Sequence, residues 1–199
     1  MQPLSFGERL VLSVSPSIGI SLYPDHAQVP TDLLKHADTA MYQAKAAGRH
    51  TYQLYSESMD EKTRHRAILA SSLRRALERN ELSLVYQPRL SLKQQRITGV
   101  EALLRWQSKE FGEVSPVTFI PVAEESGLIL EIGAWALREA LQTLRSWHGQ
   151  GFPDLTVAVN VSAMQLQRGD LADVVARTLG ETGVAAGFLE LELTESVIM

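Results

Sequence analysis

The sequence contains no cysteine. Disulfide bonds, iron–sulfur clusters and thiolate zinc sites are therefore excluded, and any metal ion must be bound through oxygen or imidazole ligands. Long apolar runs are also missing. The longest, residues 128–137, is interrupted by Glu131 and falls well short of the roughly 20 residues of a membrane-spanning helix. We therefore expect no membrane segment in this chain and a cytoplasmic location, although a longer parent protein could be anchored through other segments.

An excess of positive charge is the third absence, because the formal net charge is -4. Proteins that bind nucleic acids need a basic surface to meet the phosphates, so we expect no nucleic-acid partner. Arginines do gather within residues 56–80, but acidic residues are interspersed among them. This mixture favours a solvated, ion-paired helix face over a nucleic-acid patch. A hydrophobic fraction of 45% over 199 residues is enough for the core of one ordinary domain or of two small ones.

The first part of the sequence predicts a strand, a turn and a helix. Residues 10–22 are rich in β-branched side chains, and Pro16 within them suggests an edge or a bulge. Thr31 can cap a helix that ends at Gly48. The apolar positions of this helix are Leu34, Ala37, Met41 and Ala44. Residues 56–80 predict a connecting helix. Its apolar face carries Leu69, Leu73, Ala76 and Leu77.

Beyond residue 82, predicted strands alternate with predicted helices. This order is typical of βα units with a largely parallel sheet, and therefore of the α/β class. The expected strands are residues 82–87, which stop at Pro88, and residues 97–106, 156–162 and 189–195. The expected helices are a stretch that begins at Ser115-Pro116, followed by residues 130–147 and 171–179.

Polar side chains recur on one face of three of these strands. Because successive side chains of a strand alternate between faces, Glu101 and Arg105 share a face, and Asn160 and Glu192 occupy the polar faces of the next two strands. Residues near the carboxyl ends of barrel strands build active sites, and carboxylates there are costly unless they are paired or bind a cation. Oxygen ligands suit Mg²⁺ or Mn²⁺, and a guanidinium such as that of Arg105 suits an anionic oxygen beside the metal. The alternative, in which Glu101 and Arg105, or Glu192 and a distant base, form structural ion pairs, stays open.

Several motifs, in the correct order, resemble those of the EAL family of cyclic-di-GMP phosphodiesterases. The resemblance covers residues 67–199. The motifs are Tyr86-Gln87-Pro88, Glu101-Ala102-Leu103-Leu104-Arg105-Trp106, Phe119-Ile120-Pro121-Val122-Ala123-Glu124, Asn160-Val161-Ser162 and Glu192-Leu193-Thr194-Glu195. This resemblance implies a (β/α)8-like barrel whose first strand is antiparallel, and hydrolysis of cyclic-di-GMP to linear pGpG.

The same resemblance assigns roles to individual residues. It implies that Mg²⁺ or Mn²⁺ is bound by Glu101, Asn160 and Glu192. It also implies that Arg105 contacts a phosphate and that Gln87 and Leu103 contact the nucleotide. Glu195 resembles a glutamate that steadies an active-site loop. In hydrolysis by two metal ions, the cations activate a water molecule, polarise one phosphodiester and stabilise the leaving oxygen.

Residues 1–55 resemble the C-terminal part of a GGDEF diguanylate-cyclase domain, and residues 56–66 are then a linker and the start of the connecting helix. The matching motifs are Ser17-Ile18-Gly19-Ile20-Ser21, Tyr23-Pro24, Ala37-Asp38-Thr39-Ala40-Met41-Tyr42 and Ala44-Lys45-Ala46-Ala47-Gly48-Arg49. The resemblance implies that Lys45 and Arg49 contact nucleotide phosphates, whereas by themselves both residues are typical solvated charges near the end of a helix. The signature loop and the first metal-binding aspartate of that family are absent, so we expect no cyclase activity.

A (β/α)8 barrel needs on the order of 250 residues, and about four of its eight strands are predicted before Met199. We therefore expect an incomplete barrel, formed by the N-terminal half of an EAL domain. Three hypotheses follow. The intact parent is a phosphodiesterase and, as the family implies, a homodimer. Alternatively, it is a receptor that binds cyclic-di-GMP without hydrolysing it. In the third hypothesis, the chain is a truncated product without function.

Overall fold

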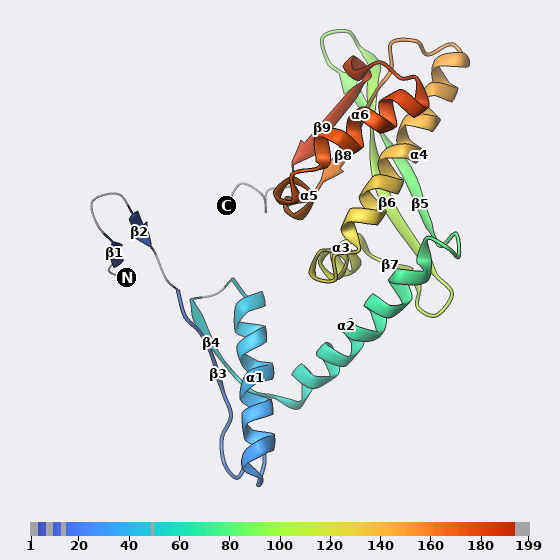
Figure 1. The fold of residues 1–199 in the computed structure, drawn as a ribbon. Coiled ribbons are helices and arrows are strands. Elements are labelled where there is room, and N and C mark those ends of the chain that lie inside the picture. Colours follow the sequence, from blue (N-terminus) through green and yellow to red (C-terminus); the bar gives the residue numbers. More distant parts are fainter. Residues whose placement is uncertain (1–3, 7–9, 13–14, 49, 194–199) are drawn as a thin grey trace. The chain divides into compact units, whose positions relative to one another are not determined.

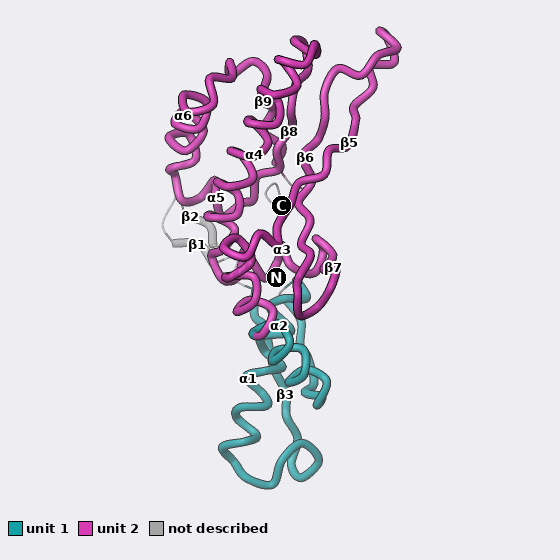
Figure 2. Tube along the Cα trace, turned by 90° about the vertical axis from the view of Figure 1, so that its right-hand side faces the viewer, with its two compact units in different colours: residues 1–67 teal, residues 68–199 magenta. Residues whose placement is uncertain are grey.

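A computed structural model of the chain describes residues 4–6, 10–12, 15–48 and 50–193. The chain divides into two compact units, residues 1–67 and residues 68–199 (Figure 2). Each unit contains its own strands and helices, and helix α2 (Glu57–Ala76) has residues in both. Helices and strands alternate along most of the chain (Figure 1), which confirms the expected α/β class.

The described part of the first unit contains two small pairs of strands, the long helix α1 and the beginning of α2. Strands β1 (Leu4–Phe6) and β2 (Leu10–Leu12) are antiparallel, and β3 (Ser17–Ile20) and β4 (Thr51–Leu54) are parallel. Helix α1 (Pro30–Ala46) lies against β3 and β4 (Figure 1). The approach to β3 is very close, because a side chain at Gly19 would overlap the backbone of Ala37 and Met41.

Helix α1 begins two residues earlier than the sequence predicted. Val29 occupies the N-cap position, and Pro30 takes the first turn, where its fixed φ angle suits a helix and its missing N–H costs nothing. Thr31 is therefore inside the helix and is not its cap. Gly48, with φ of 101°, lies just beyond the helix end, as predicted.

Two other expectations for this unit were only partly correct. Leu34, expected on the apolar face of α1, is 73% exposed, and the buried residues of the helix are Ala40 and Ala44. Alanines bury well here because the helix packs tightly on the strand pair. The single strand expected over residues 10–22 is divided between β2 and β3, and residues 13–14 lie outside the described part of the chain.

The second unit is built around a five-stranded sheet of order β5-β6-β8-β9, with β7 paired to β6. Its strands are β5 (Leu82–Ser91), β6 (Arg96–Ser108), β7 (Gly112–Val114), β8 (Thr156–Val161) and β9 (Leu189–Leu193). Strand β5 is antiparallel to β6, whereas β6, β8 and β9 are mutually parallel. An antiparallel first strand followed by parallel strands is the arrangement that the family resemblance implied.

Helices cover one face of this sheet. They are α3 (Pro116–Glu125), α4 (Ile129–Gly149), α5 (Ala163–Arg168) and α6 (Leu171–Thr182), and a short 3-10 helix, η1 (Ala186–Phe188), precedes β9. Leucines of α4 pack on the alternate residues of β6 and β8 that face them. This core includes Val100, Ala102, Leu137, Leu141, Leu144, Val157 and Val159. The opposite side chains of the same strands therefore form a polar face.

A second core lies where α2 and α3 meet the sheet. The buried indole of Trp106 is in edge-to-face contact with Phe119, with ring centroids 5.7 Å apart. Leu69, Leu73 and Ala76 of α2 belong to the same cluster, as the periodicity of the connecting helix predicted. Tyr86 makes a similar edge contact with Trp147 at 4.8 Å, and burial raises the pKa of its phenol. Three motifs of the family resemblance, those that contain Tyr86, Trp106 and Phe119, therefore contribute to the cores.

Three elements of this unit differ from expectation. Strand β5 continues through Pro88 to Ser91. Within the described residues β5 is paired on one side only, so the missing N–H of a proline can face the unpaired side without loss of a hydrogen bond. The short strand β7, which forms a hairpin with β6, was not predicted. Helix α5 was also missed, although Ser162 and Gln165 form a capping box at its start.

Candidate functional site

The polar face of the sheet gathers side chains from all four main strands. Alternation places Gln87 and Glu101 on this face, and the two are register partners of β5 and β6. Asn160 and Glu192 are register partners of β8 and β9. Because Glu101 pairs with Ala158, two residues before Asn160, the three predicted ligand positions lie on adjacent strands within two residues of one another.

A hydrogen bond joins two of the predicted ligands. Asn160 Nδ2 donates to Glu101 Oε1 over 2.8 Å. The donor is the amide nitrogen, so the amide oxygen of Asn160 is not used by this contact. The bond runs between the parallel strands β6 and β8, and the residue after β8, Ser162, is fixed by the capping box of α5. Two contacts therefore fix the end of β8, one made by the Asn160 side chain and one made by Ser162 two residues later.

The third predicted ligand, Glu192, is engaged by an arginine. Arg89 Nη2 lies 2.6 Å from Glu192 Oε1, and Arg89 Nη1 lies 2.7 Å from Glu190 Oε2. Arg89 is on β5, at the other end of the strand order from β9. Glu192 therefore does form an ion pair with a base that is distant in the sequence, which is the alternative considered for it. This ion pair uses one of its two carboxylate oxygens.

Arg89 and Glu190 were not identified from the sequence as site residues. The signal was available, because Arg89 follows Gln87 by two residues and Glu190 precedes Glu192 by two, so that each shares a face with a predicted site residue. Thr156, on the same face of β8, extends the group by donating from its hydroxyl to Glu190 Oε1 over 3.3 Å.

The three residues that the resemblance assigned to substrate lie on β5 and β6. Gln87 is exposed beside Glu101, and Leu103 is half-buried opposite Val85 of β5. Arg105 Nη1 donates to the carbonyl oxygen of Leu104 over 2.7 Å, so its guanidinium lies against the backbone of its own strand. Of the two structural ion pairs considered, the structure thus records the one at Glu192, while Arg105 has a backbone partner.

Three other predicted residues belong to the first unit or are not described. Lys45 belongs to the first unit, where it lies in the last turn of α1 with its ammonium 5.9 Å from the ring centroid of Tyr42. Arg49 and Glu195 lie outside the described residues.

The motif Phe119–Glu124 lies on helix α3 and not on the polar face. Phe119 is fully buried in the core. Burial, with a smaller contribution from the neighbouring charge of Glu125, raises the pKa of the Glu124 carboxyl. This motif therefore supports the fold of the unit, and its glutamate favours the protonated form more than an exposed one would.

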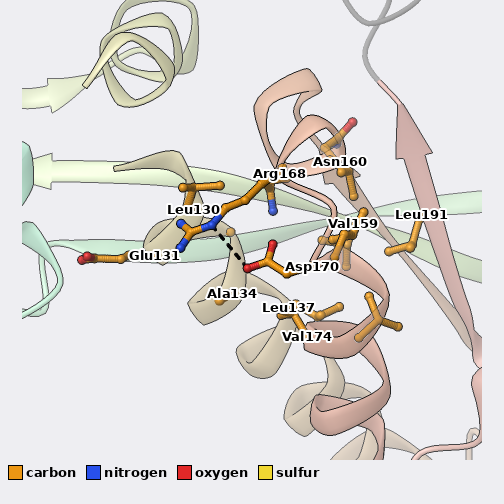
Figure 3. A pocket seen from close by; sticks show the side chains of 15 residues that line it. Leu130, Glu131, Ala134, Leu137, Val159, Asn160, Arg168, Asp170, Val174 and Leu191 are labelled. Atoms are coloured by element: carbon orange, nitrogen blue, oxygen red, sulfur yellow. Dashed lines mark ion pairs between the residues drawn. The ribbon is translucent and has the colours of Figure 1, made fainter. Parts of the chain in front are cut away.

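A cavity of about 210 Å³ lies on the helix-covered side of β8, between α4 and α6 (Figure 3). Its lining is largely apolar, with an ion pair between Arg168 Nε and Asp170 Oδ2 at 3.3 Å at its edge. Asn160 lies at the rim, and Figure 3 shows its amide directed away from this pair. The cavity is thus distinct from the face that carries Glu101 and Glu192.

The polar face offers carboxylate and amide oxygens, which are the types of ligand that a hard cation prefers. Within the ranges that the structure describes, no three His, Cys, Asp or Glu residues are clustered as a metal-binding group. The predicted set is instead two carboxylates and one amide, and Asn160 can use its oxygen while its nitrogen stays on Glu101. Oxygen donors of this kind are those that Mg²⁺ and Mn²⁺ accept.

Two known protein families match parts of this sequence. The sequence model of the EAL domain matches residues 70–199, which is more than half of the chain. The chain therefore belongs to the EAL domain family. The model of the diguanylate cyclase GGDEF domain matches residues 2–51. Both families are those inferred from the sequence motifs, in the same order, and about four strands of the (β/α)8-like barrel of the EAL domain are present. No helix in the described part of the chain is long and apolar enough to cross a membrane.

Curated relatives include two proteins of Pseudomonas aeruginosa. The bifunctional diguanylate cyclase/cyclic di-GMP phosphodiesterase MucR is 42% identical over 191 residues, which are 96% of this chain and 28% of that protein. The cyclic di-GMP phosphodiesterase NbdA is 39% identical over 198 residues, which are 100% of this chain and 25% of that protein. The chain thus spans about a quarter of the length of these relatives.

Solved structures give the same family. The complex of the MucR phosphodiesterase with c-di-GMP is 43% identical in sequence, with a TM-score of 0.63 over 66% of this chain and 53% of that chain. The EAL enzyme Bd1971 in its cGMP-bound form is 26% identical, with a TM-score of 0.66 over 88% of this chain and 45% of that chain. The chain therefore corresponds to about half of each of these structures.

Proposed function

We propose that this chain is part of a phosphodiesterase that hydrolyses cyclic-di-GMP to linear pGpG with Mg²⁺ or Mn²⁺. The observation that carries the proposal is the hydrogen bond between Asn160 and Glu101, with Glu192 in register beside Asn160. Three oxygen donors thus lie on adjacent strands of a face that no helix in the described part of this unit covers. The names of two similar proteins, both cyclic di-GMP phosphodiesterases, support the choice of substrate.

In this proposal Glu101, Asn160 and Glu192 hold the cation. When bound, the metal supplies an activated water and neutralises charge on the phosphodiester. The carboxylates bring negative charge to the face, and Asn160 holds Glu101 in place through its amide nitrogen while offering its oxygen. Two carboxylates on a shared face favour a divalent cation because it offsets their mutual repulsion.

Substrate contacts are proposed for the residues on β5 and β6. Gln87 is exposed beside Glu101 and can donate or accept a hydrogen bond from a base or ribose. Leu103 supplies an apolar surface for a base. Arg105 would exchange the Leu104 carbonyl for a phosphate oxygen, since a guanidinium binds an anion more strongly than a neutral carbonyl. Glu195 is proposed to steady a loop beside the site.

The N-terminal unit is proposed to contribute no cyclase activity. We propose that the chain consists of a GGDEF remnant over residues 1–55, a linker over residues 56–66 and part of an EAL domain over residues 67–199. Lys45 and Arg49 remain proposed phosphate contacts of the remnant. A homodimer is proposed for the intact protein.

The test uses the protein extended to the length of its relatives. Purified protein is incubated with cyclic-di-GMP and Mg²⁺ or Mn²⁺, and formation of pGpG is followed by chromatography. We expect turnover that stops when EDTA removes the metal and returns when excess Mg²⁺ is restored. Binding of cyclic-di-GMP without turnover would instead identify a receptor. A protein that neither binds nor hydrolyses it would contradict the proposal.

A further inference from the structure

Arg89 spans an unusual distance across the polar face. It belongs to β5, while both of its carboxylate partners belong to β9, and strands β6 and β8 lie between them. The guanidinium therefore lies over the middle of the sheet. A long side chain that crosses two strands must find small neighbours along its path, because any bulky residue there would obstruct it.

Two of the positions between Arg89 and Glu190 are small. Gly99 is the register partner of Arg89 on β6, and it has no side chain to block the path. A Cβ atom at Gly99 would overlap Thr156 Oγ1, so the glycine also makes room for the threonine. Thr156 in turn donates to Glu190 Oε1 over 3.3 Å. In the next row of the sheet, Ala158 separates Glu101 from Glu190.

The guanidinium divides its two terminal nitrogens between two carboxylates. Nη1 lies 2.7 Å from Glu190 Oε2, and Nη2 lies 2.6 Å from Glu192 Oε1. Arg89 thus uses Oε1 of Glu192, and Oε2 is the oxygen through which Glu192 would bind a cation. One positive and two negative charges leave this group with a net charge of about -1. Glu190 therefore offsets Arg89 and keeps the face attractive to a metal ion.

From this geometry we propose that Arg89 is a positioning residue for the metal ligand Glu192, with Glu190 as its counter-charge. The inference rests on the proposed function, because it takes Glu192 to be a ligand. Arg89 fixes the rotamer of Glu192 and so reduces the entropy that the carboxylate loses when it binds the ion. A substitution that removes such a partner of a metal ligand typically weakens metal binding by about 10- to 100-fold.

The experiment measures Mn²⁺ affinity by electron paramagnetic resonance, using the protein extended to the length of its relatives and without substrate. Arg89→Met removes the charge and keeps an unbranched chain, and we expect it to weaken Mn²⁺ binding by about tenfold. Arg89→Lys keeps the charge but cannot bridge both carboxylates in the same geometry, so its affinity should lie between those of Arg89→Met and the unmodified protein.

Two further variants complete the set, a control at Arg96 and a test of the counter-charge at Glu190. Arg96 is an exposed arginine of β6 whose partner, Asp154, lies 3.6 Å away, and Arg96→Met should leave the affinity unchanged. Glu190→Gln removes the negative charge that offsets Arg89, so that the positive charge of Arg89 is balanced by Glu192 alone. The face then attracts a cation less strongly, and Glu190→Gln should also weaken Mn²⁺ binding. Unchanged affinity in Arg89→Met would overturn the proposal. Tighter binding would overturn it as well, since Arg89 would then compete with the ion.

Glu192→Gln distinguishes a failure of the proposed metal ligand Glu192 from a failure of the positioning role of Arg89. If this variant binds Mn²⁺ as the unmodified protein does, the ligand assignment of the proposed function fails. If Glu192→Gln loses binding while a folded Arg89→Met retains it, only the role of Arg89 fails. Circular dichroism reports folding of each variant. Should Arg89→Met not fold, Arg89→Lys decides, because unmodified affinity in that variant would overturn the positioning role.

Discussion

Asn160 donates its amide proton to Glu101 across 2.8 Å, from one parallel strand to the next. The two residues are 59 positions apart in the sequence. Their contact fixes which atom of each side chain is available: Asn160 keeps its oxygen, and Glu101 keeps the oxygen that the amide does not occupy. This is the orientation required if both residues are to bind a cation through oxygen.

The first prediction concerns Glu101. In the protein extended to the length of its relatives, Glu101→Ala should abolish conversion of cyclic-di-GMP to pGpG, because it removes a metal ligand and the acceptor for Asn160. Formation of pGpG is measured at saturating Mg²⁺. Glu113→Ala, at an exposed glutamate of β7, is the matched control and should be fully active. Undiminished turnover in Glu101→Ala would show that this residue is not a ligand.

The second prediction concerns Tyr55 of the first unit. Its hydroxyl donates to Asp60 Oδ2 over 2.7 Å, and its ring stacks on His36 with centroids 4.0 Å apart. Burial first, and then the hydrogen bond and charge of Asp60, raise the pKa of the phenol from 10.0 to about 12. Because the folded chain favours the protonated phenol, this stabilisation is complete below pH 10 and is lost as the pH rises toward 12.

Tyr55→Phe should therefore lower the free energy of unfolding by about 1 kcal/mol near neutral pH. Its destabilisation relative to the unmodified chain should diminish as the pH rises above 10. Urea denaturation at several pH values measures both effects. Tyr52→Phe is the control, since Tyr52 is 67% exposed on the neighbouring strand and should change little. Equal effects of the two substitutions would contradict the role assigned to the Tyr55 hydroxyl.

The third prediction concerns Gly19, where β3 meets α1. A methyl group there would overlap backbone atoms of Ala37 and Met41, which cannot move as a flexible side chain can. Gly19→Ala should therefore destabilise the first unit by about 2–3 kcal/mol, as expected for overpacking. Thermal denaturation followed by circular dichroism provides the measurement.

A glycine with free space supplies the contrast. Nothing lies within 4 Å of a Cβ atom at Gly180, which is inside helix α6. Gly180→Ala should stabilise the second unit by up to about 1 kcal/mol, because alanine favours the helix. A stabilising effect of Gly19→Ala would mean that α1 and β3 are not as closely packed as the structure has them.

The fourth prediction compares two serines at N-cap positions. The Ser162 side chain accepts from the Gln165 backbone N–H at the start of α5, whereas Ser115, at the start of α3, makes no side-chain capping bond. Ser162→Ala should cost about 1 kcal/mol of stability, and Ser115→Ala should cost less. Urea denaturation of the two variants side by side tests this difference. The reverse order would contradict the capping role of Ser162.

Much of the fold could be predicted because it depends on local patterns. Alternation along β6 placed Glu101 on the polar face and Trp106 in the core, and helical periodicity gave the buried face of α2. The path of β5 through Pro88 could not be predicted locally. A proline ends most strands, and only the absence of a partner on one side of β5, within the described residues, permits it here.

The sequence by itself determined the family, the strands that carry the polar residues and the face to which each residue points. These features follow from side-chain alternation, which the geometry of the extended backbone fixes. The tertiary structure alone decided that Asn160 bonds to Glu101 and that Arg89 reaches Glu192. Such contacts depend on the order of the strands in the sheet and on the small residues between them. Neither is encoded within a single strand, because each arises only when distant segments pack side by side.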